Sequence, residues 1–283
     1  MAIKNLLNLD KSTYQCIISA ENQKSSMKKI LILDMSDRVA GDIEDKLCAK
    51  GLTAQRMCSL IQFGQSVAIT ATSPNMTILV NSMQPDIILN FHSQNTETVE
   101  RTLQLAERCG VRIVNCNTAR ALCADRARLL PTLRSEGMTV PGFFYGHPSQ
   151  LLASMKGECI CKDPVGHLVI RTNCGAISSR EELVYCETLV PCNGVVRSVY
   201  RVGKLTFTME KSDTLGKGRV LPSERVESKG AEIAVVDSIC KHADLDYCNV
   251  DFINGTVIDV NCFPNIFRHR DAVDAIVEHV ASM

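Results

Sequence analysis

The residues best suited to chemistry lie near the C-terminus, in a segment that reads as two short strands around an Asn-Gly turn at residues 254–255. In the second strand, residues 256–260, alternate side chains share a face, so Asp259 and the following Asn261 should point the same way. The tight turn brings Asp251 alongside on the partner strand. Two carboxylates and one carboxamide oxygen are hard ligands that suit magnesium. We therefore predict a metal site formed by Asp251, Asp259 and Asn261.

An exposed polar face on an edge hairpin is the alternative explanation for the same three residues. However, Asp and Asn are poor strand formers, and here they flank apolar residues of the strand. This composition favours the metal site over a merely polar edge.

Two dissimilar halves of the chain would have to position these residues. In the first half, short apolar runs alternate with amphipathic segments, which predicts a parallel α/β sheet. The expected strands cover residues 28–34, 77–80, 85–91 and 111–115, and the expected helices cover 39–50 and 95–109. Such sheets bind ligands at the carboxyl ends of their strands, where turn formation and helix capping are the ordinary roles of Asp and Asn. The polar residues at these ends are Asp34, Asn90, His92 and Asn115.

The pattern changes near residue 118. A helix is expected over residues 118–137, because apolar residues recur on one side and Gly137 ends it. Hairpins dominate the rest, with expected strands at 158–162, 167–172, 195–202 and 204–210, and helices at 178–183, 231–242 and 271–281. Residues 212–229 are rich in Gly, Lys and Ser and are expected to form a mobile loop.

Composition excludes several classes of function. The 283 residues have a formal net charge of zero and no block of like charge, so we expect no nucleic-acid partner. No apolar run approaches the roughly 18 residues that span a bilayer, so we expect no membrane partner. The polar N-terminal segment does not resemble a secretory signal, and we therefore expect a cytoplasmic protein.

The 14 cysteines are unusually many for such a chain. The closest pair is Cys159 and Cys161, and no repeated C-x₂-C pair indicates a zinc or iron–sulfur site. We interpret the cysteines as small buried apolar residues.

Residues 257–264 resemble the strand motif that closes the active site in the ATP-grasp superfamily, where an acidic residue and an Asn two positions later hold metal ions. Other segments resemble the superfamily in the same order. Residues 117–141 resemble the link between its first two domains, 159–162 the strand whose lysine contacts ATP phosphates, and 185–190 the hinge strand. The resemblance runs from about residue 28 to the C-terminus.

This resemblance implies the fold and its division. The expected fold is an α/β N-terminal domain with a parallel sheet, followed by α+β ATP-grasp central and C-terminal lobes. The expected divisions are an N-terminal extension at 1–27, a pre-ATP-grasp domain at 28–118, a central lobe at 119–187 and a C-terminal lobe at 188–283.

The resemblance also implies roles for individual residues, with ATP and Mg²⁺ as the cofactors. Lys162 would contact the phosphates, Glu187 would accept hydrogen bonds from the ribose, and the hinge backbone would meet adenine. The expected nucleotide contacts are Lys162, Cys186, Glu187, Thr188 and Leu189, and the expected catalytic residues are Arg126, Lys211, Arg197 and Arg201. Three features depart from the superfamily: the short flap at residues 163–167, the arginine at position 126 where lysine is common, and the uncertain register of Arg197 and Arg201.

The implied reaction is ATP-dependent ligation of a carboxylate to an amine through an acyl phosphate, with small-molecule or peptide substrates. An inositol-polyphosphate-type kinase of the same fold is an alternative, because His167 is compatible with such a kinase. A nucleotide-binding protein without turnover is a third hypothesis, which the short flap favours. A homodimer is also compatible with the sequence.

Overall fold

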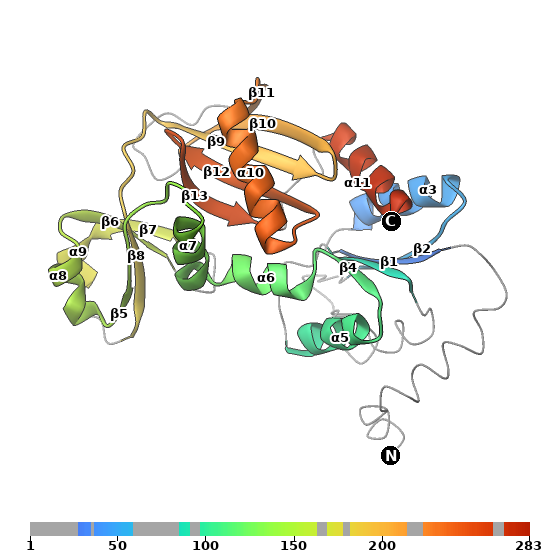
Figure 1. Cartoon of the computed structure of the whole chain (residues 1–283), viewed down its shortest axis with the longest axis horizontal. Coiled ribbons are helices and arrows are strands. Elements are labelled where there is room, and N and C mark those ends of the chain that lie inside the picture. Colours follow the sequence, from blue (N-terminus) through green and yellow to red (C-terminus); the bar gives the residue numbers. More distant parts are fainter. Residues whose placement is uncertain are drawn as a thin grey trace, which may run out of the picture. The chain divides into compact units, whose positions relative to one another are not determined.

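The structure is a computed structural model that describes residues 28–34, 37–58, 85–90, 97–162, 169–177, 182–213, 223–262 and 269–283. The chain divides into two compact units. One comprises Met1–Asn117 with Asn265–Met283, and the other comprises Thr118–Pro264 (Figure 1).

The first unit contains a parallel sheet with the strand order β2-β1-β3-β4. Its strands are β1 (Lys29–Asp34), β2 (Thr53–Cys58), β3 (Ile87–Asn90) and β4 (Arg112–Val114), and its helices are α3 (Asp37–Ala49), α5 (Glu97–Arg108) and α11 (Arg270–Ser282). Ile30, Leu31 and Ile32 in β1 are fully buried, so both faces of that strand are covered, as is typical of a parallel strand. The C-terminal helix α11 packs against α3, which is more than two hundred residues earlier in the chain (Figure 1).

Most of the expected elements of this unit are confirmed, but β2 was not predicted. Its sequence, TAQRMC, lacks the apolar run that identified the other strands. The expected strand at 77–80 and His92 lie outside the described residues, whereas Asn90 and Asn115 are fully buried.

The second unit contains two antiparallel sheets. The smaller one has the order β5-β8-β6-β7 and is covered on one face by α8 (Leu151–Ser154) and α9 (Cys174–Ile177). Its strands are β5 (Phe143–Gly146), β6 (Glu158–Lys162), β7 (Val169–Asn173) and β8 (Val184–Thr188). The parallel first sheet and these antiparallel sheets confirm the predicted mixture of α/β and α+β structure.

The larger sheet has the order β11-β10-β9-β12-β13. Its strands are β9 (Val195–Val202), β10 (Leu205–Ser212), β11 (Glu224–Val226), β12 (Tyr247–Ile253) and β13 (Thr256–Asn261). Helix α10 (Gly230–Ala243) lies across one face and contacts β9 and β12 (Figure 1). We call this side the α10 face and the other side the acidic face, which carries Asp251, Asp259 and Asn261.

Two expectations for this unit were wrong in part. The helix expected at 118–137 is two helices, α6 (Asn117–Ala124) and α7 (Arg126–Ser135), because the Asp125 side chain caps α7 by accepting a hydrogen bond from Arg128 N at 3.2 Å. The loop expected at 212–229 contains the strand β11, which pairs with β10. The helix expected at 178–183 lies largely outside the described residues, and Glu182 and Leu183 are not helical.

The cysteines of the smaller sheet lie on its core side. Strand alternation points Cys159 and Cys161 of β6 and Cys186 of β8 toward α8 and α9, in one apolar cluster. Burial raises the pKa of the Cys159 thiol to about 12. These cysteines therefore act as small apolar residues, as the sequence indicated.

Candidate functional site

A β-bulge in the β12–β13 hairpin decides which side chains share a face. A regular two-residue hairpin would place Asp251 opposite Ile258. Instead, the register shifts between Asp251 and Phe252, and Asp251 lies opposite Asp259. Val257 and Val260 are both buried although they lie three residues apart, which agrees with one extra residue between them.

The bulge brings the predicted metal ligands to one face of the sheet. Beyond it, Asn261 lies opposite Asn249, so two carboxylates and two amides occupy neighbouring positions on β12 and β13. With the two-residue turn and no bulge, Asp259 and Asn261 would point away from Asp251, because a shift of one residue in the strand register moves every side chain to the other face. The acidic face therefore depends on the extra residue, Ile258.

Asp251 is held by three neighbours on the acidic face. Lys211 Nζ of β10 lies 2.8 Å from its Oδ2, and Asn249 Nδ2 donates to its Oδ1 at 2.9 Å. Ser198 of β9 also donates its hydroxyl to Oδ1. With 14% of its side chain exposed, the Asp251 carboxylate needs these donors, because a buried charge is costly without partners.

Asp259 has a second cation beside it. Arg126, the first residue of α7, places its Nε 3.8 Å from Asp259 Oδ1. Arg126 and Lys211 thus bracket the two facing carboxylates. The structure brings these two predicted catalytic residues to the predicted metal ligands.

Lys162 connects the smaller sheet to the hairpin. Its Nζ donates to the carbonyl oxygen of Ile258 at 2.9 Å and lies 2.8 Å from Glu187 Oε1. The carbonyl that it contacts belongs to the bulged residue. Burial raises the pKa of the Glu187 carboxyl, and the charge of Lys162 opposes this effect.

A cavity of about 530 Å³ lies beside Lys162. Its walls are largely apolar, with Ile160, Leu189, Val190 and Ile258 among them. Four of the predicted nucleotide contacts line it: Lys162, Glu187, Thr188 and Leu189. Cys186 points to the opposite side of β8, into the core cluster, so only its backbone faces this side.

The structure does not bring Arg197 and Arg201 to the acidic face. Ser198 contacts Asp251, so the neighbouring Arg197 and, four residues on, Arg201 point to the α10 face. Arg201 pairs there with Asp237 of α10.

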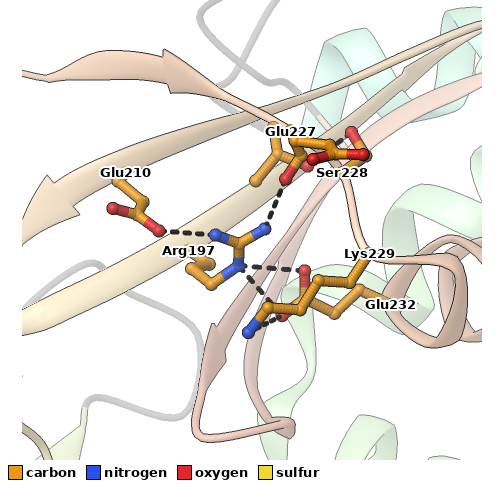
Figure 2. Close-up of polar contacts among 7 residues, drawn as sticks. Arg197, Glu210, Glu227, Ser228, Lys229 and Glu232 are labelled. Atoms are coloured by element: carbon orange, nitrogen blue, oxygen red, sulfur yellow. Dashed lines mark hydrogen bonds and ion pairs between the residues drawn. The ribbon is translucent and has the colours of Figure 1, made fainter.

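Arg197 is enclosed in its own cluster on the α10 face. Its Nε lies 3.0 Å from both carboxylate oxygens of Glu232, its Nη1 contacts Glu210, and its Nη2 donates to the carbonyl of Glu227 at 2.8 Å. Figure 2 shows the guanidinium between these acids. This arrangement ties β9 to β10, α10 and the segment after β11.

Ser198 and Asn249 were missed by the sequence reasoning. Asn249-x-Asp251 is the mirror image of Asp259-x-Asn261, a pattern that could have indicated Asn249. Nothing in the sequence around Ser198 indicates its contact, because only the pairing of β9 with β12 creates it. The flap at 163–167, including His167, lies outside the described residues.

The donor set of the acidic face fits magnesium. Across the described parts of the chain, no three His, Cys, Asp or Glu side chains form a group that could hold a metal ion. The hairpin instead offers two carboxylates with an amide oxygen. Magnesium commonly takes one or two carboxylates and fills its remaining positions with water and phosphate oxygens.

Within the described residues, no helix has the length and apolar character needed to cross a bilayer.

Solved structures similar to this chain share one fold. The ATP-grasp ligase PsnB, complexed with a minimal precursor, matches with a TM-score of 0.65 and 15% identity over 90% of this chain and 99% of its own. A RimK-domain ATP-grasp protein from Sphaerobacter thermophilus matches with a TM-score of 0.65 and 17% identity, covering 89% and 98%. The D-alanine–D-alanine ligase of Bacillus anthracis, complexed with ATP, matches with 0.61 and 14%, covering 90% and 98%.

No protein-family model and no curated protein sequence matches the chain. The structural matches nevertheless cover nearly its whole length. The chain therefore has the ATP-grasp fold, as the order and spacing of its sequence motifs predicted.

Proposed function

We propose that this protein is an ATP- and magnesium-dependent ligase that joins a carboxylate to an amine through an acyl phosphate. The observation that carries the proposal is the contact of Lys162 with the bulged Ile258. This contact links the cavity to the strand that bears Asp259 and Asn261. A nucleotide in the cavity would therefore direct its phosphates toward a face that carries both acids and cations.

In this proposal, the apolar walls of the cavity hold the adenine beside the backbone of residues 187–189, and Lys162 approaches the phosphates as a point charge. Asp251, Asp259 and Asn261 would hold magnesium, which supplies positive charge to the phosphate oxygens. Lys211 and Arg126 lie against the same carboxylates and would pair with phosphate or substrate oxygens when these bind.

The reaction needs no protein nucleophile. A carboxylate oxygen of the substrate attacks the γ-phosphorus, the bond to the β-phosphate oxygen breaks, and ADP leaves. The amine then attacks the acyl carbon, inorganic phosphate departs, and the amine loses a proton to solvent. The protein contributes alignment and neutralisation of charge, the main means by which enzymes accelerate phosphoryl transfer.

Peptides are the substrate class that the structural relatives favour. PsnB is described with a precursor peptide, and the macrocyclase MdnC of Microcystis aeruginosa with the precursor peptide MdnA. A small-molecule acid and amine are the alternative. The proposal includes a cytoplasmic location, the lobes at 119–187 and 188–283, and the backbones of Glu187, Thr188 and Leu189 as nucleotide contacts.

A trapping experiment tests this function. Purified protein is incubated with ATP, magnesium, candidate peptides or acids, and hydroxylamine, which converts an acyl phosphate to a stable hydroxamate. A ligase releases ADP and phosphate and forms the hydroxamate. A kinase releases ADP but retains the phosphoryl group on its product, and a binding protein binds ATP without releasing ADP. Either of the last two results would overturn the proposal that the protein is a ligase.

A further inference from the structure

The position of Glu187 in the structure leaves open which residue binds the ribose of the nucleotide. The sequence predicted that Glu187 accepts hydrogen bonds from the ribose, but this side chain is only 4% exposed and lies 2.8 Å from Lys162 Nζ. A carboxylate that is buried and already in contact with a buried cation is poorly placed to receive two further hydroxyl groups. Another acceptor in the same cavity would serve this role better.

Asp213 is the other carboxylate of the cavity lining. It directly follows β10, and its backbone N–H donates to the carbonyl of Gly194 at 2.9 Å. Gly194 and its neighbour Asn193 line the same cavity, so this hydrogen bond fixes Asp213 at the wall formed by the segment after β8. Asp213 is half-buried, which leaves its side chain accessible to a ligand.

Arg171, a cation of the same cavity, pairs mainly with a carboxylate other than Asp213. Arg171 of β7 also lines the cavity, but its Nη2 contacts Glu158 Oε2 at 2.8 Å. Glu158 is the main cause of the raised pKa of Arg171, and the charge of Asp213 is the smallest contributor. The principal partner of Arg171 is therefore Glu158.

The chemistry of a carboxylate suits a ribose. An ionised carboxylate accepts hydrogen bonds through two oxygens and donates none, so it can receive both hydroxyls of a vicinal diol. Acidic side chains perform this role in other nucleotide-binding folds. The remaining polar groups of the cavity include the cations Lys162 and Arg171, which suit phosphate rather than sugar hydroxyls.

We propose that Asp213 accepts the ribose hydroxyls of the nucleotide and so selects ribonucleotides over deoxyribonucleotides. This assignment rests on the proposed function, because it requires a nucleotide in the cavity. It places the ribose beside Asp213 and leaves Glu187 to hold Lys162 in position.

The test compares the dissociation constants of ATP, 2′-deoxy-ATP and 3′-deoxy-ATP by calorimetry with magnesium and no second substrate. Wild-type protein should bind ATP about tenfold or more tightly than the deoxynucleotides, the size of a hydrogen bond to a charged group. Asp213→Ala should lose this advantage, so that the ratio falls to near one while deoxynucleotide affinity stays the same. Asp213→Asn keeps the size and one acceptor oxygen, and should retain part of the ratio.

Asp42→Asn is the matched control, since Asp42 is exposed on α3 in the other unit and should leave the ratio unchanged. An unchanged ratio in both Asp213 variants, with ATP still bound, would overturn the assignment and leave the proposed function standing. Wild-type protein that binds no nucleotide at all would overturn both.

Discussion

The two faces of the sheet β11-β10-β9-β12-β13 both carry charged side chains, but in opposite arrangements. On the α10 face, Arg197 lies between Glu210 and Glu232, so that opposite charges alternate. On the acidic face, Asp251 lies directly opposite Asp259. Like charges in such a cross-strand pair destabilise a sheet.

This difference separates a stabilising cluster from the surface that we propose to bind metal. The Arg197 guanidinium uses three nitrogens on partners from three segments, which satisfies it within the protein. The facing carboxylates depend on Lys211 and Arg126 and would gain from a further cation. Proteins that break a local rule of stability commonly do so at functional sites. Four predictions test this contrast.

Asp259→Asn is expected to have the largest effect, a loss of at least about a hundredfold in turnover, the scale of removing one electrostatic contact from an active site. Asn keeps the size and one oxygen but lacks the charge that would hold a cation. The melting temperature should not fall, because the repulsion from Asp251 is relieved. ADP release at several magnesium concentrations and a thermal melt measure both, and higher magnesium should restore part of the rate.

Glu224→Gln removes one carboxylate from the exposed strand β11 of the same sheet and serves as the control. It should leave turnover and magnesium dependence unchanged. Wild-type turnover of Asp259→Asn at limiting magnesium would show that the acidic face is not the metal site.

Arg197→Ala should act on stability instead. It leaves Glu232, whose side chain is 6% exposed, without its main partner, and we expect a loss of about 2–4 kcal/mol in the free energy of unfolding. ATP affinity should stay the same, because Arg197 lies on the face away from Asp251. Urea denaturation and calorimetry measure the two quantities.

Arg201→Ala is the matched control on the same strand. Arg201 and its partner Asp237 are 28% and 50% exposed, so this change should cost no more than about 1 kcal/mol. If Arg197→Ala abolished turnover without reducing stability, Arg197 would have the catalytic role that the sequence predicted, and the contrast between the faces would fail.

Lys162→Ala should weaken ATP binding by about 1.5–3 kcal/mol, the range for a charge-assisted hydrogen bond. Lys162 contacts the acidic hairpin through Ile258, so this effect would belong to the proposed binding surface and not to the Arg197 cluster. Calorimetry without a second substrate measures the affinity. ATP affinity equal to that of the wild type would remove Lys162 from the nucleotide site.

Strand alternation and the Asn-Gly turn predicted that Asp251, Asp259 and Asn261 share a face, but not the bulge that makes this possible. Asp259 and Asn261 are conspicuous because such residues are rare in strands. The bulge at Ile258 is not marked by Gly or Pro. The sequence therefore predicted the correct face but not the bulge that creates it. The ATP-grasp fold was predictable because several motifs occur in a fixed order and each motif is local in the sequence.

Positions that depend on pairing between distant strands were not predictable. Whether Arg197 faces the acids or α10 depends on the register of β9 against β12, about fifty residues later. A single step in that register would exchange Arg197 for Ser198. The burial of Glu187 by Lys162 is likewise a contact between β6 and β8, which the sequence of the hinge cannot indicate.

The smallest expected effect is a pH dependence of stability from Glu187. Burial raises the pKa of this carboxyl in the folded protein above its ordinary value of 4.5, so the folded state holds the proton more strongly than the unfolded state. Stability from this group is therefore fully present below pH 4.5 and is lost as the pH rises through the folded pKa, with a slope of at most about 1.4 kcal/mol per pH unit for one proton. Glu187→Gln cannot ionise and should lack this loss.

Urea denaturation between pH 4 and pH 8 should show the wild type losing stability relative to Glu187→Gln as the pH rises. Other carboxyls titrate in both proteins and cancel in the difference, which isolates Glu187. A difference that stays constant, or that grows in favour of the wild type with rising pH, would mean that Lys162 outweighs burial and that Glu187 is a fully matched ion pair like the Arg197 cluster.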